Sequence, residues 1–225
     1  MTRGIVIAGN ESVLTGALEA EAAGRVEHYA LALIPNRFSG DEKQPGQKAL
    51  SDDFAASRIS MDWNPGSPIS ARTLVLAAEN RLGRIDEAIL VCDPPSVSCA
   101  AADLDFSDIE VLANDHIKNW FFLVKELASV FKAREKGTLA FVYPEKDSRD
   151  DDNDLLGSAA LASFRSFTRS LLAAASAEPY LTLGFSGADT SDSAGFASFV
   201  FKQLDEGNRR ASGKLHKHGK LGFFR

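Results

Sequence analysis

Cysteine is rare in this 225-residue chain, and long apolar runs are missing from it. The two cysteines, Cys92 and Cys99, form neither a disulfide framework nor a C-x-x-C pair, so a reducing, cytoplasmic setting is expected. No apolar stretch approaches the roughly 18 residues that a membrane-spanning helix needs. The run from Gly4 to Ala8 is too short and too strand-like for the core of a signal peptide. These absences predict a chain with neither a disulfide scaffold nor a membrane partner.

An excess of positive charge is also missing. Lysine and arginine total 25 against 31 aspartates and glutamates, so the net charge of −6 argues against a nucleic-acid partner. The acidic run from Asp147 to Asp154 lacks the glycine and the final glutamate of a calcium loop, so we expect a solvated loop and no metal site. The basic cluster from Arg209 to Lys220 is expected to be a charged surface tail; the alternative is a contact with an acidic partner or with a neighbouring subunit's acidic loop.

The chain does contain short apolar runs that alternate with longer segments of helical periodicity. Strands that alternate with helices of ten residues or more predict a parallel sheet with helices on both faces. Neither an internal repeat nor a linker divides the sequence, so a single domain over residues 1–225 is expected. Expected strands cover residues 4–8, 28–34, 58–63, 87–92, 138–143 and 180–185, and expected helices cover 13–23, 69–82, 109–136, 155–177 and 192–206.

Four local patterns follow one another along these elements. Residues 83–91 read G-R-I-D-E-A-I-L-V, Asp62 ends the third expected strand, residues 167–171 read F-T-R-S-L, and Ser-Gly-Lys opens the segment 212–224. In this order they resemble the short-chain dehydrogenase/reductase family, with its G-x-I-D-x-L-V, an acid near the adenine ring, L-T-R-S-L, and a closing T-G segment. The resemblance implies a three-layer, Rossmann-type doubly wound sheet and an oxidoreductase that uses NAD or NADP.

The glycine-rich turn of that family, T-G-x-x-x-G-x-G, is altered here. Gly9 is kept, but the second and third glycines are replaced by Val13 and Thr15. Side chains at these positions would crowd the pyrophosphate, and Glu11 would bring a carboxylate towards it. We therefore expect no bound cofactor in the usual pose. The remaining cofactor-binding candidates are Gly9, Asp62 and Arg37, the last for the 2′-phosphate of NADP.

The family's acid–base residues are replaced as well. By this alignment the catalytic serine falls at Pro144 and the relay asparagine at His116. The tyrosine and lysine fall at Gly157 and Leu161, neither of which can donate a proton to a carbonyl. The resemblance thus predicts a catalytically inactive relative that acts as a binding or regulatory subunit. Two alternatives stay open: a module that binds another small molecule, and an NAD(P)-dependent oxidoreductase with a rearranged site around Tyr143, Lys146 and His116.

Aromatic residues crowd the two longest expected helices, 109–136 and 155–177. Trp120, Phe121 and Phe122 are consecutive, and no single helix face buries three adjacent side chains. Phe164 and Phe167 on the second helix add to this surplus. A subunit interface accounts for these residues, and in the family this helix pair forms the interface of dimers and tetramers. We expect a homodimer or homotetramer, or a hetero-oligomer with an active relative.

Overall fold

The protein is built on a parallel seven-stranded sheet. The computed structural model describes residues 3–38, 56–97, 99–145, 154–188 and 191–219. All six strand pairs are parallel, and the strand order is β3-β2-β1-β4-β5-β6-β7, which reverses direction between β1 and β4. The strands are β1 Ile5–Asn10, β2 Tyr29–Ile34, β3 Arg58–Ser60, β4 Glu87–Val91, β5 Thr138–Pro144, β6 Leu181–Gly187 and β7 Leu215–His218.

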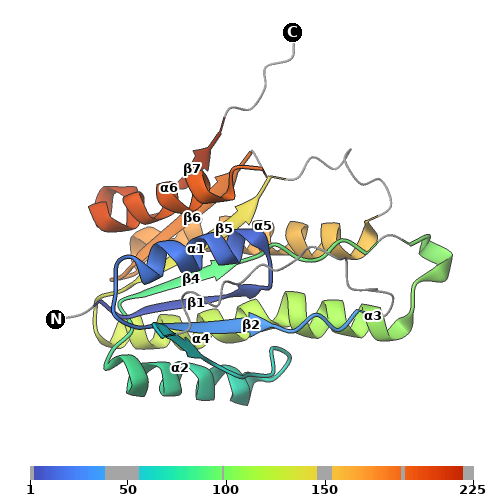
Figure 1. Cartoon of the computed structure of the whole chain (residues 1–225), viewed down its shortest axis with the longest axis horizontal. Coiled ribbons are helices and arrows are strands. Elements are labelled where there is room, and N and C mark those ends of the chain that lie inside the picture. Colours follow the sequence, from blue (N-terminus) through green and yellow to red (C-terminus); the bar gives the residue numbers. More distant parts are fainter. Residues whose placement is uncertain (1–2, 39–55, 98, 146–153, 189–190, 220–225) are drawn as a thin grey trace, which may run out of the picture.

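Helices cover both faces of the sheet (Figure 1). Helices α1 (Val13–Ala23) and α6 (Ser193–Glu206) pack on one face and on each other. Helices α2 (Pro68–Leu82), α4 (Asn119–Ala133) and α5 (Leu155–Ala174) cover the other face. The strands carry apolar side chains on both faces because both faces are buried. The prediction of a three-layer, doubly wound Rossmann-type fold is confirmed.

The helix ends follow local sequence chemistry. Ser67 caps α2 by accepting a hydrogen bond from the Ser70 amide, and Pro68 occupies the first turn, where its missing N–H costs nothing. Asp154 caps α5 in the same way, through the amide of Gly157. Gly207 ends α6 with a φ of +53°, a left-handed conformation that favours glycine.

The segment expected as one helix over residues 109–136 is more complex. It begins earlier, with helix α3 (Phe106–Val111), continues through a π-helical turn (Leu112–Lys118), and becomes α4 only at Asn119. It ends at Ala133, before Gly137, where an added Cβ would lie 2.2 Å from the Phe131 ring. The wider π turn has no signature in apolar periodicity. Such turns are rare and are frequently found at functional sites.

Strand β7 lies within the segment that the sequence predicts to be a charged surface tail, because its residues are mostly polar. The His216 ring stacks on Phe185 with the centroids 5.4 Å apart, and the His218 ring stacks on Phe196 at 5.6 Å. On the strand between them, Lys217 pairs with Glu145 after β5, with Nζ and Oε1 3.1 Å apart. Aromatic stacking and one ion pair therefore hold an edge strand that hydropathy does not reveal.

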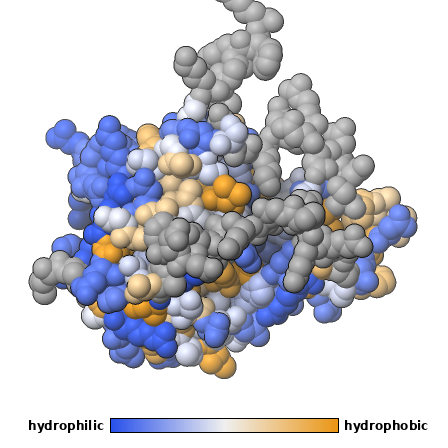
Figure 2. Space-filling view, in the orientation of Figure 1, coloured by the Kyte–Doolittle hydropathy of each residue, from blue (hydrophilic) through white to orange (hydrophobic). Residues whose placement is uncertain are grey.

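The visible surface mixes hydrophilic and hydrophobic residues (Figure 2). Paler apolar atoms gather at the right end of that view. Within the part of the chain that the structure describes, no helix combines the length and apolarity needed to cross a bilayer.

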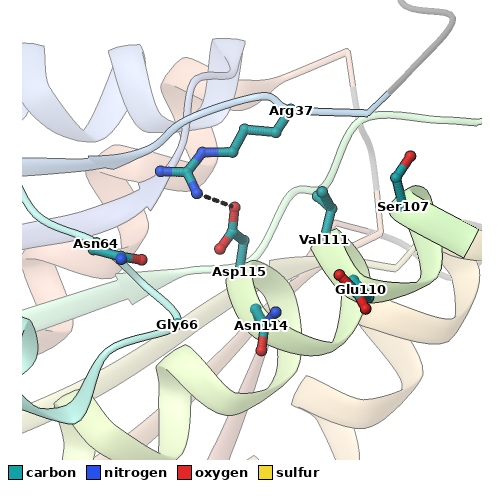
Figure 3. A pocket seen from close by; sticks show the side chains of 8 residues that line it. All are labelled: Arg37, Asn64, Gly66, Ser107, Glu110, Val111, Asn114 and Asp115. Atoms are coloured by element: carbon teal, nitrogen blue, oxygen red, sulfur yellow. Dashed lines mark ion pairs between the residues drawn. The ribbon is translucent and has the colours of Figure 1, made fainter.

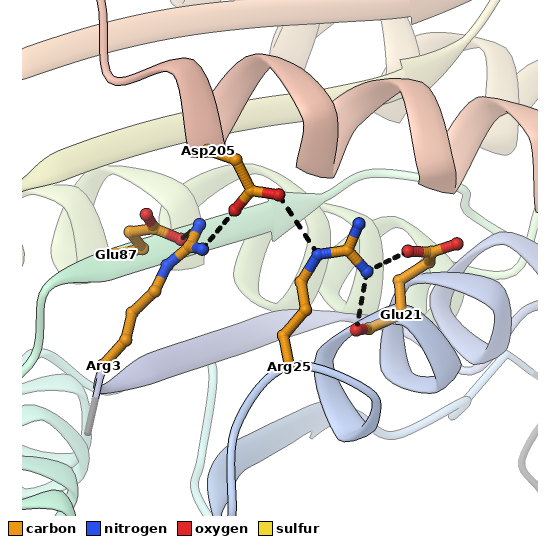
Figure 4. A network of polar contacts seen from close by, with 5 residues as sticks. All are labelled: Arg3, Glu21, Arg25, Glu87 and Asp205. Atoms are coloured by element: carbon orange, nitrogen blue, oxygen red, sulfur yellow. Dashed lines mark hydrogen bonds and ion pairs between the residues drawn. The ribbon is translucent and has the colours of Figure 1, made fainter.

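An ionic cluster joins four elements at the edge of the sheet where the parallel strands begin (Figure 4). Arg3 lies between Glu87 at the start of β4, with Nη2 and Oε2 2.5 Å apart, and Asp205 near the end of α6. Asp205 also pairs with Arg25, beyond α1, at 3.4 Å, and Arg25 pairs with Glu21. Burial raises the pKa of Glu87, and the Arg3 guanidinium opposes that rise. The Glu87 charge therefore depends on Arg3.

The substitution Arg3→Ala is expected to lower the free energy of unfolding by about 2 kcal/mol, because it leaves a nearly buried carboxylate without its cation. The measurement is urea unfolding at pH 7. The control is Lys125→Ala, which breaks an exposed pair with Glu126 and should cost about 0.5 kcal/mol or less. Equal losses in the two variants would contradict this role for Arg3.

Candidate functional site

The sheet reverses its strand order between β1 and β4, and ligands of open α/β sheets bind beside such a point. Here the first turn satisfies its own polar groups. The Ser12 hydroxyl accepts a hydrogen bond from the Thr15 amide at 3.2 Å, and the Thr15 hydroxyl donates to the Asn10 carbonyl at 2.6 Å. Val13 is 62% exposed where α1 begins. The turn thus lacks the glycines of a phosphate-binding loop, and its Thr15 amide donates to a side chain within the turn.

Gly9 lies within β1, next to β4. A Cβ at Gly9 would lie 2.6 Å from the Val91 carbonyl oxygen. Close packing of the two strands therefore requires this glycine, whether or not a ligand is bound. Its retention in the sequence carries no information about phosphate binding.

The crevice beside the reversal point is bridged by side chains. Asn10 Nδ2 donates to His116 Nδ1 at 3.2 Å, and Asn10 Oδ1 accepts from the Asp93 amide at 3.3 Å. The Phe38 ring stacks on the imidazole of His116 with the centroids 5.1 Å apart. Asn10 therefore ties β1 both to the loop after β4 and to the π-helical turn. Sequence reasoning missed Asn10 and Phe38; the only available signal was a polar residue directly after a buried strand.

His116 is 1% exposed, and burial lowers its pKa to about 4. The ring is therefore neutral at pH 7. Because Nδ1 accepts from Asn10, the ring proton lies on Nε2, which has no hydrogen-bond partner among the described residues. His116 is thus placed as a buried structural bridge, with no carboxylate in hydrogen-bond contact that would activate it as a base.

The position aligned with the catalytic tyrosine has no room for a side chain. A Cβ at Gly157 would lie 2.7 Å from the Pro95 carbonyl oxygen and 2.5 Å from Asp154 Oδ2. Asp154 Oδ1 accepts from the amides of both Gly157 and Val97, at 2.9 and 3.0 Å. The loop after β4 is therefore fastened onto the start of α5. Leu161, aligned with the lysine, is buried in the core.

The candidates for a relocated proton donor do not form one cluster. Tyr143 is 2% exposed, packs edge-on against Phe164, and lies under the Arg165 guanidinium at 5.4 Å. Burial raises the pKa of Tyr143, and the positive charges of nearby Arg165 and Arg169 partly offset this rise. Lys146 lies outside the described residues. Tyr143 and His116 thus have separate sets of neighbours.

A polar pocket of about 370 Å³ opens beside the crevice, towards β2 and β3 (Figure 3). Arg37, the candidate for a 2′-phosphate, lines it and pairs with Asp115 across it. Asp62, the other candidate near an adenine ring, is exposed and is not one of the lining residues. The described residues hold no group of three His, Cys, Asp or Glu side chains suited to a metal ion. The lining residues are Arg37, Asn64, Gly66, Ser107, Glu110, Val111, Asn114 and Asp115.

The aromatic residues of the two long helices divide between core and surface. Trp120 and Phe164 are buried, with centroids 4.8 Å apart, and are not available to a partner. Phe121 is 49% exposed and packs at 4.2 Å on Phe167, which is partly exposed like Phe122. Phe121, Phe122 and Phe167 therefore remain as the surface aromatics of this face.

Comparisons with known proteins identify the fold. The sequence matches no protein-family model and no curated protein. Levodione reductase superposes with a TM-score of 0.72 at 12% identity, over 96% of this chain and 95% of that one. The NADH-dependent reductase A1-R′, solved in complex with NAD, gives 0.69 at 13%, over 96% and 94%. A protein of Aeromonas hydrophila subsp. hydrophila described as a short-chain dehydrogenase/reductase family oxidoreductase gives 0.70 at 15%, over 98% and 100%. The chain therefore has the fold of these reductases.

His116 makes the stability of the protein sensitive to acid. The unfolded chain binds a proton at this residue below its ordinary pKa of about 6.5, whereas the folded chain does so only near 4. The free energy of unfolding should fall, by on the order of 3 kcal/mol from this residue, as the pH drops from 6.5 to 4.

The substitution His116→Asn should remove this component, and the exposed His28→Asn should not. Chemical unfolding at half-unit pH steps measures the two slopes against the parent protein. If His116→Asn and the parent lost stability in parallel, His116 would not be the neutral buried bridge.

Proposed function

We propose that this chain is a non-catalytic protein of short-chain dehydrogenase/reductase type that acts as an oligomeric binding or regulatory subunit. One observation carries the proposal: the proton donor's position is Gly157, and the Pro95 carbonyl fills the space of its missing side chain. Reduction of a carbonyl needs an acid at the oxygen. An acid at residue 157 would have to displace the loop after β4.

The crevice supports the same proposal. A dinucleotide lays its pyrophosphate against the first turn, beside the reversal point. The Asn10–His116 bridge spans this region, and the Thr15 hydroxyl and amide are both engaged within the turn. A dinucleotide bound in the ordinary pose would have to break these contacts or adopt a bent conformation that avoids them. We therefore expect nicotinamide cofactors to bind weakly or not at all.

Association through α4 and α5 is the second part of the proposal. Phe106 and Ile109 on α3 and Phe121 on α4 are 85%, 41% and 49% exposed. Phe106 and Ile109 are three residues apart on α3, and Phe167 on α5 packs against Phe121. Exposed apolar surface of this kind favours burial against a partner. The proposed partner is a second copy, in a homodimer or homotetramer, with an active relative as the alternative.

The two free cysteines support a cytoplasmic location.

The second candidate function is an NAD(P)-dependent oxidoreductase with a rearranged site. It is favoured by the NAD complex of one structural neighbour and by Arg37, whose guanidinium stands half-exposed after β2. Tyr143 would then have to serve as the proton donor.

A thermal-shift titration with NAD, NADH, NADP and NADPH separates the two functions, because a ligand that binds only the folded state raises the melting temperature. We expect no saturable rise with any of the four, with an active dehydrogenase of this fold as the positive control. A saturable rise, together with carbonyl reduction that is lost on Tyr143→Phe, would establish the second candidate instead.

Sedimentation equilibrium tests the interface. The parent protein should have the mass of a dimer or tetramer, and Phe121→Glu should reduce it to that of a monomer, because a carboxylate would be buried without a partner. Ile69→Glu is the control, since Ile69 is 77% exposed and lies on α2, outside the α4–α5 pair. A monomeric parent, or an unchanged mass for Phe121→Glu, would refute the proposed surface.

A further inference from the structure

Strand β7 lies at one end of the sheet, beside α6 (Figure 1). Its inner side is paired with β6. The Gly184 amide donates to the Lys214 carbonyl at 3.0 Å, and the Ala188 amide donates to the His218 carbonyl at 2.9 Å. On its outer side, the described residues provide no further strand. Strand β7 is partly exposed along its length, whereas the interior strands β4 and β5 are buried throughout.

The main chain of two residues points to this outer side. In an extended strand the amide and carbonyl of one residue point the same way, and the direction alternates from residue to residue. Lys214 and His218 point towards β6, and by alternation His216 does too. Leu215 and Lys217 therefore point away from β6, and we call their amides and carbonyls the outer edge of β7. Such main-chain groups are a template for an added strand.

The outer edge is held in place by contacts on the inner side of β7. The rings of His216 and His218 stack on phenylalanines of β6 and α6. The turn before β7 is joined to β6 as well, because the Gly213 amide donates to the Thr182 carbonyl at 2.8 Å. An edge that is ordered in advance loses less conformational entropy when a partner binds.

Positive charge is concentrated along this edge, although the whole chain has a net charge of −6. Residues 207–219 include no aspartate or glutamate and carry four cations, Arg209, Arg210, Lys214 and Lys217. Arg209 and Arg210 are exposed on the single helical turn before β7, and Lys214 is exposed next to the strand. Within the part of the chain that the structure describes, these three form no ion pair, and the Lys217 side chain, paired with Glu145, is still 51% exposed.

These charges decide which kind of chain fits the edge. A second copy of β7 is a poor occupant, because it would bring the same lysines and arginines together, and like charges on facing strands are destabilising. An acidic strand would place carboxylates beside these cations instead. A nucleic acid would be attracted to the cations, but its phosphate backbone has no alternating amides and carbonyls to pair with the edge.

We propose that the outer edge of β7 is a docking site for an acidic segment of another protein, which adds to the sheet as an extended strand. The main-chain groups of Leu215 and Lys217 hold the segment, and the cations beside them select its carboxylates. Because β7 has four residues and its charges are exposed, binding is weak and decreases with added salt. The site goes beyond the proposed function, since it involves neither the crevice nor the association of α4 with α5.

The probe is a fluorescently labelled short peptide of alternating glutamate and threonine, titrated with the full chain at low salt and followed by anisotropy. One matched peptide has glutamine for glutamate, which removes the charge. Another keeps the charge but has alternate amides N-methylated, which removes main-chain donors. We expect saturable binding of the acidic peptide, and binding at least about tenfold weaker for each matched peptide, the loss expected for hydrogen bonds or charge pairs at one edge.

Two variants at one position separate the main chain from the charge. Lys217→Pro removes the outward amide, which edge strands tolerate, and Lys217→Gln removes the same charge but keeps the amide. Lys217→Pro should weaken peptide binding about fivefold more than Lys217→Gln does. The double variant Arg209→Gln, Arg210→Gln should also weaken it, whereas Arg72→Gln, at an exposed site on α2, should not. Melting temperatures verify folding, and if Lys217→Pro does not fold, the N-methylated peptide and the arginine variant carry the test.

Four results would overturn the proposal. The acidic peptide does not bind; the neutral or the N-methylated peptide binds equally well; single-stranded DNA or phosphatidylserine vesicles bind at these cations in place of the peptide; or sedimentation shows that a folded Lys217→Pro has a lower mass than the parent, which would assign the edge to a second copy.

Discussion

The Asn10–His116 hydrogen bond is the contact on which the other features of the site depend. It connects the end of β1 to the π-helical turn, while the other end of the same amide holds the loop after β4. That loop, in turn, lies on α5, where the Pro95 carbonyl and the Asp154 carboxylate leave Gly157 no space for a side chain. These contacts join the carboxyl ends of β1 and β4 to the π-helical turn and to the start of α5.

A polar pocket of about 370 Å³ lies beside these contacts and is lined by Arg37 and Asp115. The two regions differ in chemistry. The crevice is bridged by neutral partners, Asn10 and a histidine whose pKa burial lowers to about 4, and Phe38 stacks on that histidine. The pocket is lined by charged residues, and Arg37 and Asp115 form an ion pair there. Function depends on the particular site and does not follow from the fold alone.

Most of the fold follows from the sequence, since buried parallel strands and amphipathic helices have distinct apolar patterns. Six strands and five helical segments were predicted close to their observed positions. Strand β7 was not predicted, because it is held by stacking of His216 and His218 on phenylalanines and has no apolar pattern. The π turn was not predicted, because one extra residue in a helical turn leaves no recognisable change in the apolar pattern of the sequence. Trp120 and Phe164 were predicted as surface residues, but the pattern could not show which of three adjacent aromatics faces the sheet.

The site was less predictable than the fold. The sequence does show which residues, Val13, Thr15 and Gly157, stand where the resemblance places the phosphate glycines and the tyrosine. The contacts of the site were not predictable, because they join residues far apart in the chain: Asn10 and His116 are separated by 106 positions. Asp115 and Arg37 likewise carry no shared motif. Polar residues in such contacts have no periodicity, and their partners are fixed only when the sheet brings its strand ends together.

The most direct test of the Asn10–His116 bridge across the crevice is nitrogen-15 NMR of the His116 ring during addition of NADH to millimolar concentration. The account predicts a neutral ring with its proton on Nε2, an accepting Nδ1, and signals that do not move as NADH is added. A saturable shift of both ring nitrogens, showing that the cofactor displaces Asn10 from His116, would contradict it.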